Sequence, residues 1–167
     1  MKFRTGVYLI VIGFLSAVTA VPSIALGQTG NGVVPGDAVT PSPEQLFRVF
    51  ANHTEEWGNG AGIFWDGDGT WRAVDTDDQF LGVGEWYVTT ASRICYDVRW
   101  YWRQDFGTES RSESVCSRFR IDSDGQMWST TGSLAGPWLP FNEENLVRGN
   151  TIARGFNEVA GILNLRE

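Results

Sequence analysis

Two carboxylates, Glu85 and Asp97, are the residues whose types and spacing best suit acid–base chemistry. Each falls in an alternating apolar–polar run, and a three-residue turn at residues 90–92 sets Glu85 opposite Asp97, with Arg99 on the same face. Like charges so placed raise the pKa of one carboxyl group, which general acid–base catalysis requires. The alternative is a solvated sheet face on which arginine balances the acidic residues. The pair is therefore a candidate for catalysis, and its role stays open.

The sequence holds no complete motif for a metal site or a Ser–His–Asp hydrolase. The aspartates at residues 66–69 and 122–125 resemble the start of calcium loops, but an EF-hand needs more ligands and a glutamate at its twelfth position. Both stretches are better interpreted as Asp-Gly hairpin turns. His53 is the only histidine, no Gly-x-Ser-x-Gly accompanies it, and we expect it at a helix C-terminus. We predict no metal and no cofactor.

The chain contains eight tryptophans, which form the third group of candidates. Aromatic side chains at the mouth of a barrel suit a flat apolar ring or the face of a sugar. The competing interpretation is that they only fill the core. The candidate ligand-binding residues are four tryptophans and two charged residues near the cysteines: Trp71, Trp86, Trp100, Trp128, Asp97 and Arg99.

Cys95 and Cys116 are the only cysteines, so they pair with each other or stay free. Strand alternation puts both on the more polar face of their strands, and if they lie opposite each other, Asp97 faces Ser114. A disulfide there stabilises the fold by roughly 3 kcal/mol. The alternative is a redox pair, but there is no Cys-x-x-Cys and no nearby histidine to lower a thiol pKa. We predict a structural disulfide.

Short strands joined by tight turns must position these residues. Ser42, Pro43 and Gln45 form a capping-box helix start. Such short turns leave no room for helical crossovers, so the sheet is antiparallel. We expect a mainly β fold, an antiparallel up-and-down meander closing into a small lipocalin-like barrel with a short N-terminal helix. Seven or eight strands are expected, among them 63–65, 70–74, 80–89, 93–102, 115–121, 126–129 and 147–152. Residues 103–112 are expected to form a polar connection between two of them.

The first residues have the organisation of a secretory signal peptide. Lys2 and Arg4 precede an apolar run, and small residues follow it. The run is shorter than the roughly 20 residues that span a bilayer, which favours cleavage over a membrane anchor. We predict four segments: a signal peptide (1–25), a flexible leader (26–41), a single β-barrel domain (42–152) and a C-terminal tail with a weak helical pattern (153–167).

The charge of the chain narrows the classes of partner. The whole chain has a net charge of −7, and without the signal peptide eleven arginines stand against twenty acidic residues, a net charge of −9. Nucleic acids and anionic membranes require a basic patch. We therefore expect no nucleic-acid partner, no membrane insertion after cleavage, and a periplasmic or secreted location, where acidity favours solubility.

The order of several short motifs resembles that of a protein family. They span about residues 46–152: Gly60-Ala61-Gly62-Ile63-Phe64, Thr70-Trp71-Arg72-Ala73, Gly84-Glu85-Trp86, Arg93-Ile94-Cys95, Gly136-Pro137-Trp138 and Leu146-Val147-Arg148-Gly149-Asn150. This order resembles the exported proteobacterial proteins grouped as domain-of-unknown-function family 995. The spacing from Thr54 to Trp57 departs from the pattern, since the tryptophan is expected sooner. The resemblance implies export, a disulfide and a single domain, and it implies no reaction.

Three functions are compatible with these features. We prefer a non-catalytic exported β-barrel that binds a small molecule, a glycan or another component of the cell envelope. The second is a hydrolase or lyase that acts on an envelope polymer through a carboxylate pair, with Glu85 and Asp97 as candidates. The third is a structural or interaction protein with a filled core. A solidly packed interior would argue against the first function.

Overall fold

The computed structural model describes residues 33–165. The chain divides into two units, residues 1–30 and 31–167, and every described residue belongs to the second. The predicted signal peptide and the first part of the predicted leader therefore lie outside the described residues. Within residues 33–165, no helix is long and apolar enough to cross a membrane.

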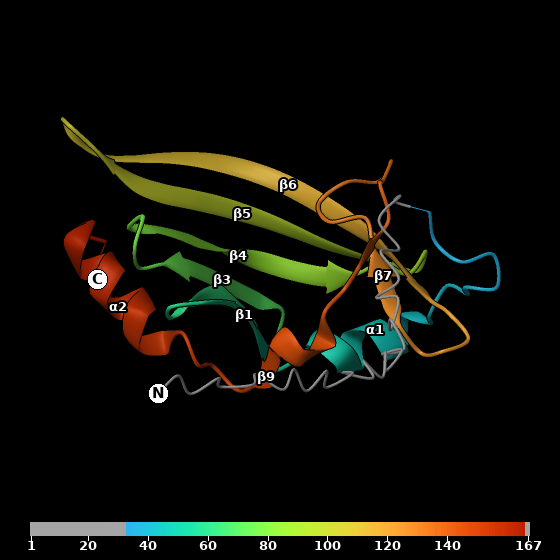
Figure 1. Cartoon of the computed structure of the whole chain (residues 1–167). Coiled ribbons are helices and arrows are strands. Elements are labelled where there is room, and N and C mark those ends of the chain that lie inside the picture. Colours follow the sequence, from blue (N-terminus) through green and yellow to red (C-terminus); the bar gives the residue numbers. More distant parts are fainter. Residues whose placement is uncertain (1–32, 166–167) are drawn as a thin grey trace, which may run out of the picture. The chain divides into compact units, whose positions relative to one another are not determined.

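Nine strands and two α-helices are formed by the described residues (Figure 1). The helices are α1 (Pro43–Phe50) and α2 (Ala153–Ile162), with a 3₁₀ turn, η1 (Glu143–Asn145). The strands are β1 (His53–Gly58), β2 (Ala61–Trp65), β3 (Thr70–Asp75), β4 (Phe80–Val88), β5 (Arg93–Gln104), β6 (Gly107–Ile121), β7 (Met127–Ser129), β8 (Leu139–Pro140) and β9 (Leu146–Arg148).

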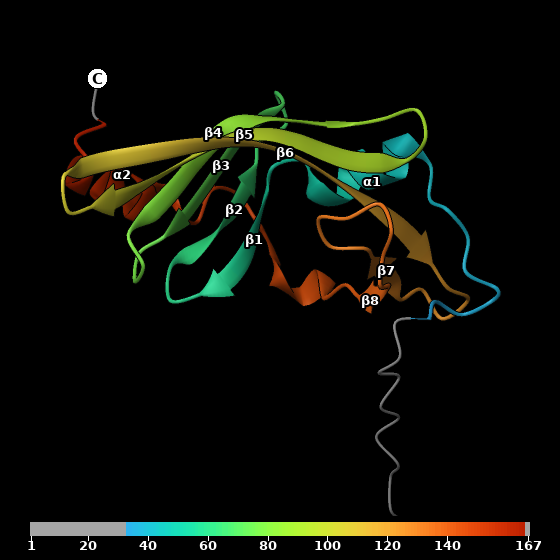
Figure 2. The ribbon, with the colours of Figure 1, turned by 90° about the horizontal axis from the view of Figure 1, so that it is seen from above.

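All nine strands belong to one antiparallel sheet, in the order β8-β7-β6-β5-β4-β3-β2-β1-β9. Consecutive strands are neighbours from β1 to β8, which confirms the predicted meander. The sheet curls into a half-barrel (Figure 2). Its edge strands, β8 and β9, do not pair with each other, so the barrel expected from the sequence stays open within the described residues. Both edges are very short, and Pro140 in β8 has no N–H to donate to another strand.

Two glycines of β4 allow close approaches that the curl requires. A Cβ on Gly84 would lie 1.9 Å from the backbone oxygen of Asp97 on β5. A Cβ on Gly82 would lie 2.7 Å from the ring of Trp71 and 2.8 Å from that of Trp100. Any larger residue would push apart the two strands at the first position and two indole rings at the second.

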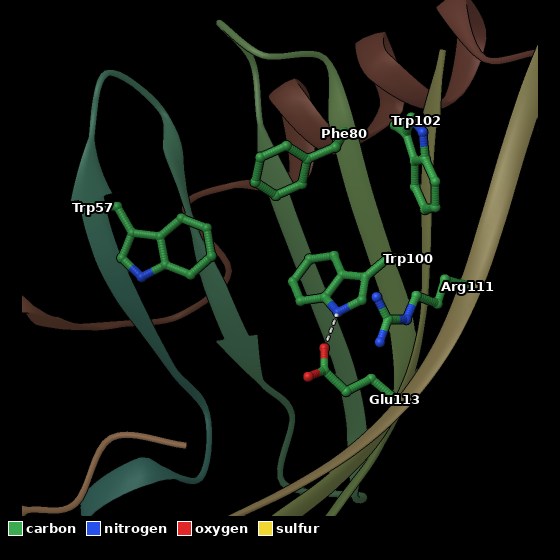
Figure 3. Close-up of a pocket in the computed structure, with 6 residues that line it drawn as sticks. All are labelled: Trp57, Phe80, Trp100, Trp102, Arg111 and Glu113. Carbon is green, nitrogen blue, oxygen red and sulfur yellow. Dashed lines mark hydrogen bonds between the residues drawn. The ribbon is translucent and has the colours of Figure 1, made fainter. Parts of the chain in front are cut away.

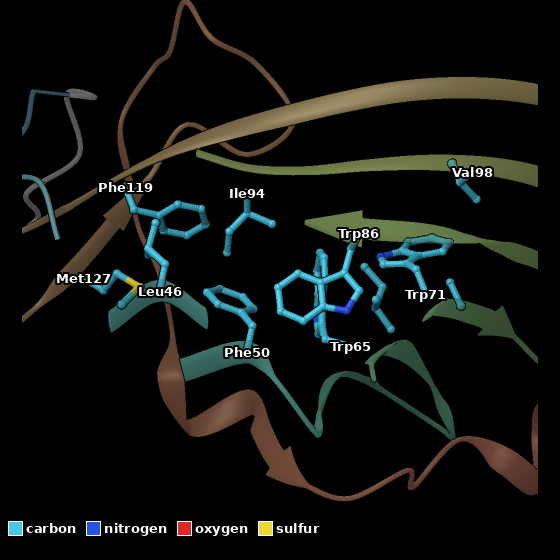
Figure 4. Packing of buried hydrophobic residues seen from close by; sticks show 11 residues of the cluster. Leu46, Phe50, Trp65, Trp71, Trp86, Ile94, Val98, Phe119 and Met127 are labelled. Carbon is cyan, nitrogen blue, oxygen red and sulfur yellow. The ribbon is translucent and has the colours of Figure 1, made fainter. Parts of the chain in front are cut away.

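An aromatic core fills part of the concave face (Figure 4). Trp71 is fully buried and stacks on Tyr96, with ring centroids 4.9 Å apart and planes 10° apart. Trp65 meets both rings edge-on, at 6.2 Å and 5.9 Å. Such pairs add about 0.5–1.5 kcal/mol each to the burial of their surface. The rings come from β2, β3 and β5, so they hold the curled strands together.

Helix α1 covers one end of this concave core. The predicted capping box is present, since the Ser42 side chain accepts from the Gln45 N–H and the Gln45 side chain accepts from the Ser42 N–H. Leu46 and Phe50 point into the core and are 0% and 1% exposed. Phe50 also meets Trp65 edge-on at 5.4 Å. The capped start thus fixes which helical face meets the sheet.

Helix α2 packs on the opposite, convex face of the sheet. Val159 and Leu163 lie in an apolar cluster with Val74 of β3. The Thr108 hydroxyl, near the tip of the β5–β6 hairpin, donates to the Leu163 carbonyl at 2.8 Å. The weak helical pattern at the C-terminal end of the sequence therefore corresponds to a docked helix.

The β5–β6 hairpin is longer than the sequence predicts. The connection expected at residues 103–112 is largely strand, because the ladder runs unbroken from Arg93 opposite Arg118 to Gln104 opposite Gly107. Residues 107–114 are all exposed. They therefore lack the apolar alternation that reveals a strand, although backbone pairing alone maintains one.

Strand β1 is also missing from the sequence-based prediction, for a similar reason. Its first residues are His53, Thr54, Glu55 and Glu56, a polar run with little alternation. Pairing with β2 on one side and β9 on the other makes it a strand. The expected position of His53 at a helix end is wrong, since α1 stops at Phe50 and His53 opens β1, with Nδ1 3.0 Å from the carbonyl oxygen of a residue two positions earlier.

The last residues of the predicted leader are attached to the sheet. Val39 and Ile121 exchange two backbone hydrogen bonds of 2.8 Å. Ala38 is 4% exposed, and its carbonyl accepts from Arg120 Nη1 at 2.8 Å. The segment before α1 therefore runs along β6.

Candidate binding site on the concave face

A hollow of about 560 Å³ opens on the concave face, toward the β5–β6 end of the core (Figure 3). It is open to solvent on one side. Four aromatic side chains and two charged ones line it: Trp57, Phe80, Trp100, Trp102, Arg111 and Glu113. The interior of the half-barrel is therefore only partly filled by the aromatic core.

Strand alternation and register bring these aromatic rings together. Trp100 and Trp102 are two residues apart on β5, so both point to the concave side. Phe80 lies opposite Trp102 in the β4–β5 ladder and meets Trp100 edge-on, with centroids 5.6 Å apart. Trp57 comes from β1, across the curl, and is 45% exposed. The curvature of the sheet thus brings β1 across the hollow from three paired strands, β4, β5 and β6.

Charged groups stand on one wall of the hollow. Arg111 and Glu113 share the concave side of β6. The indole N–H of Trp100 donates to Glu113 Oε2 at 3.2 Å, which holds both the ring and the carboxylate in place (Figure 3). The wall therefore offers a guanidinium donor and a carboxylate acceptor beside the aromatic faces.

A second, inner hollow of about 220 Å³ shares Trp57 with the first. Glu55 of β1 lines it, among mostly apolar and hydroxyl side chains. Burial raises the pKa of Glu55 above its ordinary value. The Trp65 indole N–H favours the ionised carboxylate and so lowers the Glu55 pKa in part. The two groups do not reach hydrogen-bond geometry, and this N–H has no other partner within the described residues. A carboxyl group and an indole donor are thus held in a largely apolar space.

Tyr96 is partly buried on the concave side and experiences the charges of two carboxylates, Glu113 and Glu55. Burial raises the pKa of the Tyr96 phenol to about 12, and the charges of Glu113 and Glu55 add to the rise. The phenol is therefore neutral at physiological pH and can act only as a hydrogen-bonding group there. Together, the two hollows present flat aromatic faces with a few polar atoms, an arrangement suited to holding a ligand.

One of the six predicted ligand-binding residues, Trp100, lines the larger hollow. Trp71, Trp86 and Trp128 are 0%, 3% and 4% exposed and belong to the interior. The indole N–H groups of Trp86 and Trp128 donate to the Asp66 carbonyl and to the Asp122 carboxylate, at 2.7 and 2.8 Å. These bonds tie each indole to the hairpin turn beside it.

The charged candidates lie on the convex face. Glu85 pairs with Asp97 in the β4–β5 ladder, as the sequence predicts, and both are exposed. Asp97 accepts a hydrogen bond from Ser114, and Arg99 Nε donates to Ser112 at 3.4 Å. Neither carboxylate lines a hollow of the concave face. The pair stands on an open, solvated surface.

A disulfide joins Cys95 and Cys116, which face each other in the β5–β6 ladder. Cys95 is 3% exposed. The bond staples the two longest strands on the convex side, directly behind the aromatic core. Within residues 33–165, no three His, Cys, Asp or Glu side chains gather in a way that could hold a metal ion.

Sequence reasoning missed most of the hollow. Alternation within β5 puts Trp102 on the same face as Trp100, and the β4–β5 register adds Phe80, which lies opposite Trp102. Arg111 and Glu113 were not predicted to line a site, because residues 103–112 were expected to form a connection and the outer half of β6 was not recognised as a strand. Trp57 could not be placed without β1, whose partners are remote in sequence. The signal for Trp102 is its even spacing from Trp100 on one strand, and the signal for Phe80 is the short turn that sets the register of β4 and β5.

The comparisons with known proteins identify a family and no relative of known activity. The family model described as "Protein of unknown function (DUF995)" matches residues 14–158. The match covers most of the chain, so the chain belongs to this family. No curated protein matches the chain. No solved structure matches it either.

Proposed function

We propose that this member of the family is an exported, non-catalytic binding protein. Its concave hollow takes a small molecule or a glycan segment with a flat apolar face. The observation that carries the proposal is the cluster of Trp57, Phe80, Trp100 and Trp102 around an open space of about 560 Å³. Ligand sites commonly have volumes of about 300–1,000 Å³, with mostly apolar walls and a few polar groups.

The polar groups of the two hollows support this ligand class. Glu113 and Arg111 can exchange hydrogen bonds with hydroxyl or amide groups at the edge of a ring that stacks on an indole. In the inner hollow, the Glu55 carboxyl group can exchange hydrogen bonds with a polar substituent. Since a buried polar group without a partner costs free energy, a ligand that supplies one gains affinity.

The proposal also includes a location outside the cytoplasm, which two features support. The pattern of residues 1–25 is typical of a cleaved signal peptide. The Cys95–Cys116 disulfide is consistent with an oxidising compartment. We place the mature protein in the periplasm or outside the cell, with residues 26–41 as leader, a single domain over 42–152 and a helical tail. Its partners are then small molecules, glycans or other envelope components, and not nucleic acid or the membrane interior.

The test is to identify what the exported protein carries and where it binds. Small molecules that co-purify with the wild-type protein are identified by untargeted mass spectrometry. Tryptophan fluorescence is then titrated with two probes, N-acetylglucosamine oligomers for a sugar face and 1-N-phenylnaphthylamine for an aromatic ring. We expect saturable binding of one probe class, and its loss in Trp57→Ala.

Tyr87→Ala is the matched control for Trp57→Ala. Tyr87 is 48% exposed, similar to Trp57, and lies on the convex side of β4, outside the concave hollows. Both variants therefore remove one exposed aromatic ring, and only one of them changes the proposed site. Equal binding by the two variants, or no binding of either probe class, would contradict the proposal and favour a structural or interaction role.

A second candidate function rests on Glu55 and Glu113. Both carboxylates face the concave hollows, and burial raises the pKa of Glu55. One protonated and one ionised carboxyl group are what hydrolysis of a glycosidic bond uses. The alternative function, a hydrolase or lyase acting on an envelope polymer, would then use Glu55 and Glu113 in place of Glu85 and Asp97. Turnover of peptidoglycan fragments by wild type and its loss in Glu55→Gln would support it, and binding without turnover would exclude it.

A further inference from the structure

Three arginines gather in a small hollow outside the concave site. The hollow has a volume of about 120 Å³ and lies between the β4–β5 turn, β6 and the loop after β7. Arg93 of β5 and Arg118 and Arg120 of β6 line it, together with Trp138. Within the described part of the chain, its lining includes no aspartate or glutamate.

The arrangement of these arginines costs free energy in the absence of a counter-charge. Arg93 and Arg118 are direct partners in the β5–β6 ladder, and like charges directly opposite each other destabilise a sheet. The chain as a whole has a net charge of −7, so a local cluster of positive charge is unusual here. An anion bound between the guanidinium groups would remove the repulsion.

Two of the three guanidinium groups, those of Arg118 and Arg120, are also held in place. Arg118 lies over the Trp138 ring at 5.0 Å, and Arg120 lies 6.0 Å from the same ring. Arg120 Nη1 donates to the Ala38 carbonyl at 2.8 Å. Arg118 Nε is buried and has no hydrogen-bond partner among the described residues. The site therefore contains oriented donors, one of which is unsatisfied.

We propose that this hollow binds a phosphate-type oxyanion, either as a free ion or as the terminal group of a larger molecule. Guanidinium groups match such anions by paired, charge-assisted hydrogen bonds. A hollow of about 120 Å³ has room for one such group, while the rest of a larger molecule would extend into solvent. None of the three arginines lines either concave hollow, although Phe119 borders both the inner one and this site.

The first test is calorimetric titration of the exported, disulfide-bonded protein with inorganic phosphate, with sodium chloride holding the ionic strength constant. We expect saturable binding of one phosphate per chain. Arg118→Gln and Arg93→Gln are each expected to raise the dissociation constant about tenfold or more, because each removes a charge-assisted contact. Arg93 is the cleaner change, since its side chain makes no hydrogen bond within the described residues.

Arg99→Gln is the matched control. Arg99 lies on the same side of β5 as Arg93, six residues along the strand, and does not line the hollow. Arg99→Gln removes the same charge from the same face as Arg93→Gln does, so a general electrostatic attraction of phosphate to the protein would weaken equally in both variants. Absence of phosphate binding, or equal weakening in Arg99→Gln and Arg93→Gln, would overturn the proposal. Near-UV circular dichroism of all variants confirms that the fold is intact.

A second arm separates free phosphate from a lipid headgroup. The protein is mixed with vesicles of phosphatidylcholine, with and without phosphatidylglycerol, and co-sedimentation is measured. Binding only to the anionic vesicles, lost in Arg93→Gln and reduced by added phosphate, would assign the site to a headgroup. Phosphate binding in solution without vesicle binding would assign it to a soluble anion.

Discussion

The two faces of strand β5 have opposite chemistry. On the concave side, Tyr96 packs in the aromatic core while Trp100 and Trp102 line the larger hollow. On the convex side, Asp97 and Arg99 are exposed beside the disulfide. Residue types alone point to the charged face as the place for chemistry. The curl of the sheet instead places the aromatic-lined hollow on the opposite face, because side chains from remote strands converge on a concave surface and diverge on a convex one.

The difference is clearest for partners across the curl. Trp57 of β1 and Trp100 of β5 are separated by three strands in the sheet, yet they line one hollow. Glu85 and Asp97 are direct neighbours in the ladder, yet both side chains are exposed. A hollow lined by aromatic rings from remote strands thus requires curvature as well as suitable residues, and four variants test how the two faces divide stability between them.

Trp71→Ala should have the largest effect. Trp71 is fully buried in the concave core, so its removal leaves a cavity and should reduce the free energy of unfolding by about 3–5 kcal/mol. Denaturation by urea, followed by circular dichroism, measures the change. Trp57→Ala, on the same face but 45% exposed, is the control and should cost much less. Similar losses for the two would mean that the concave face is not divided into core and hollow.

Loss of the disulfide should rank second. The double change Cys95→Ala and Cys116→Ala removes a cross-link between residues 21 apart in sequence, which should cost roughly 3 kcal/mol. Urea denaturation of the variant and of the oxidised wild type measures it. Ser114→Ala, which removes the neighbouring hydrogen bond to Asp97 on the same exposed face, is the control. If both changes lower the free energy of unfolding by the same small amount, the disulfide does not stabilise the pairing of β5 and β6.

Gly84→Ala should have an intermediate effect through the backbone. The added methyl group would lie 1.9 Å from the Asp97 carbonyl oxygen, so β4 and β5 must move apart, at a cost of about 1–3 kcal/mol. The thermal midpoint and the urea midpoint should both fall. A methyl group on Gly36 meets no atom within 4 Å, and Gly36→Ala serves as the comparison. An unchanged midpoint for Gly84→Ala would show that the curl tolerates a wider strand spacing.

Glu55→Gln should have the smallest effect, and a pH-dependent one. Burial raises the pKa of Glu55 in the folded protein above its ordinary 4.5, so the native state binds the proton more tightly than the unfolded chain. The stability that protonation confers is complete at low pH and is lost as the pH rises from 4.5 through the folded pKa. Relative to wild type, Glu55→Gln should therefore gain stability over that window. Urea midpoints measured across the window test the sign, and parallel profiles would contradict it.

Several features of the fold could be predicted from local sequence. The capping box at Ser42 depends on residues within four consecutive positions, 42–45, and is present. The pairing of Glu85 with Asp97 follows from alternation and turn length and agrees with the observed ladder. Alternation also puts Cys95 and Cys116 on the polar face of their strands, and the predicted disulfide is present. The strands that were missed, β1 and the outer half of β6, carry polar residues and depend on backbone pairing with strands that their own residues do not reveal.

The sequence by itself determined which side chains share a face, because successive side chains of a strand point to opposite sides. It also determined the antiparallel meander, because its connections are short. Only the tertiary structure decided which of those faces becomes concave, and so why Trp71 is sealed in the core while Trp57 and Trp100 border open space. Whether a side chain is buried depends on packing against strands that are remote in the chain. The curl of the sheet determines which strands pack together, and no local sequence pattern encodes that curl.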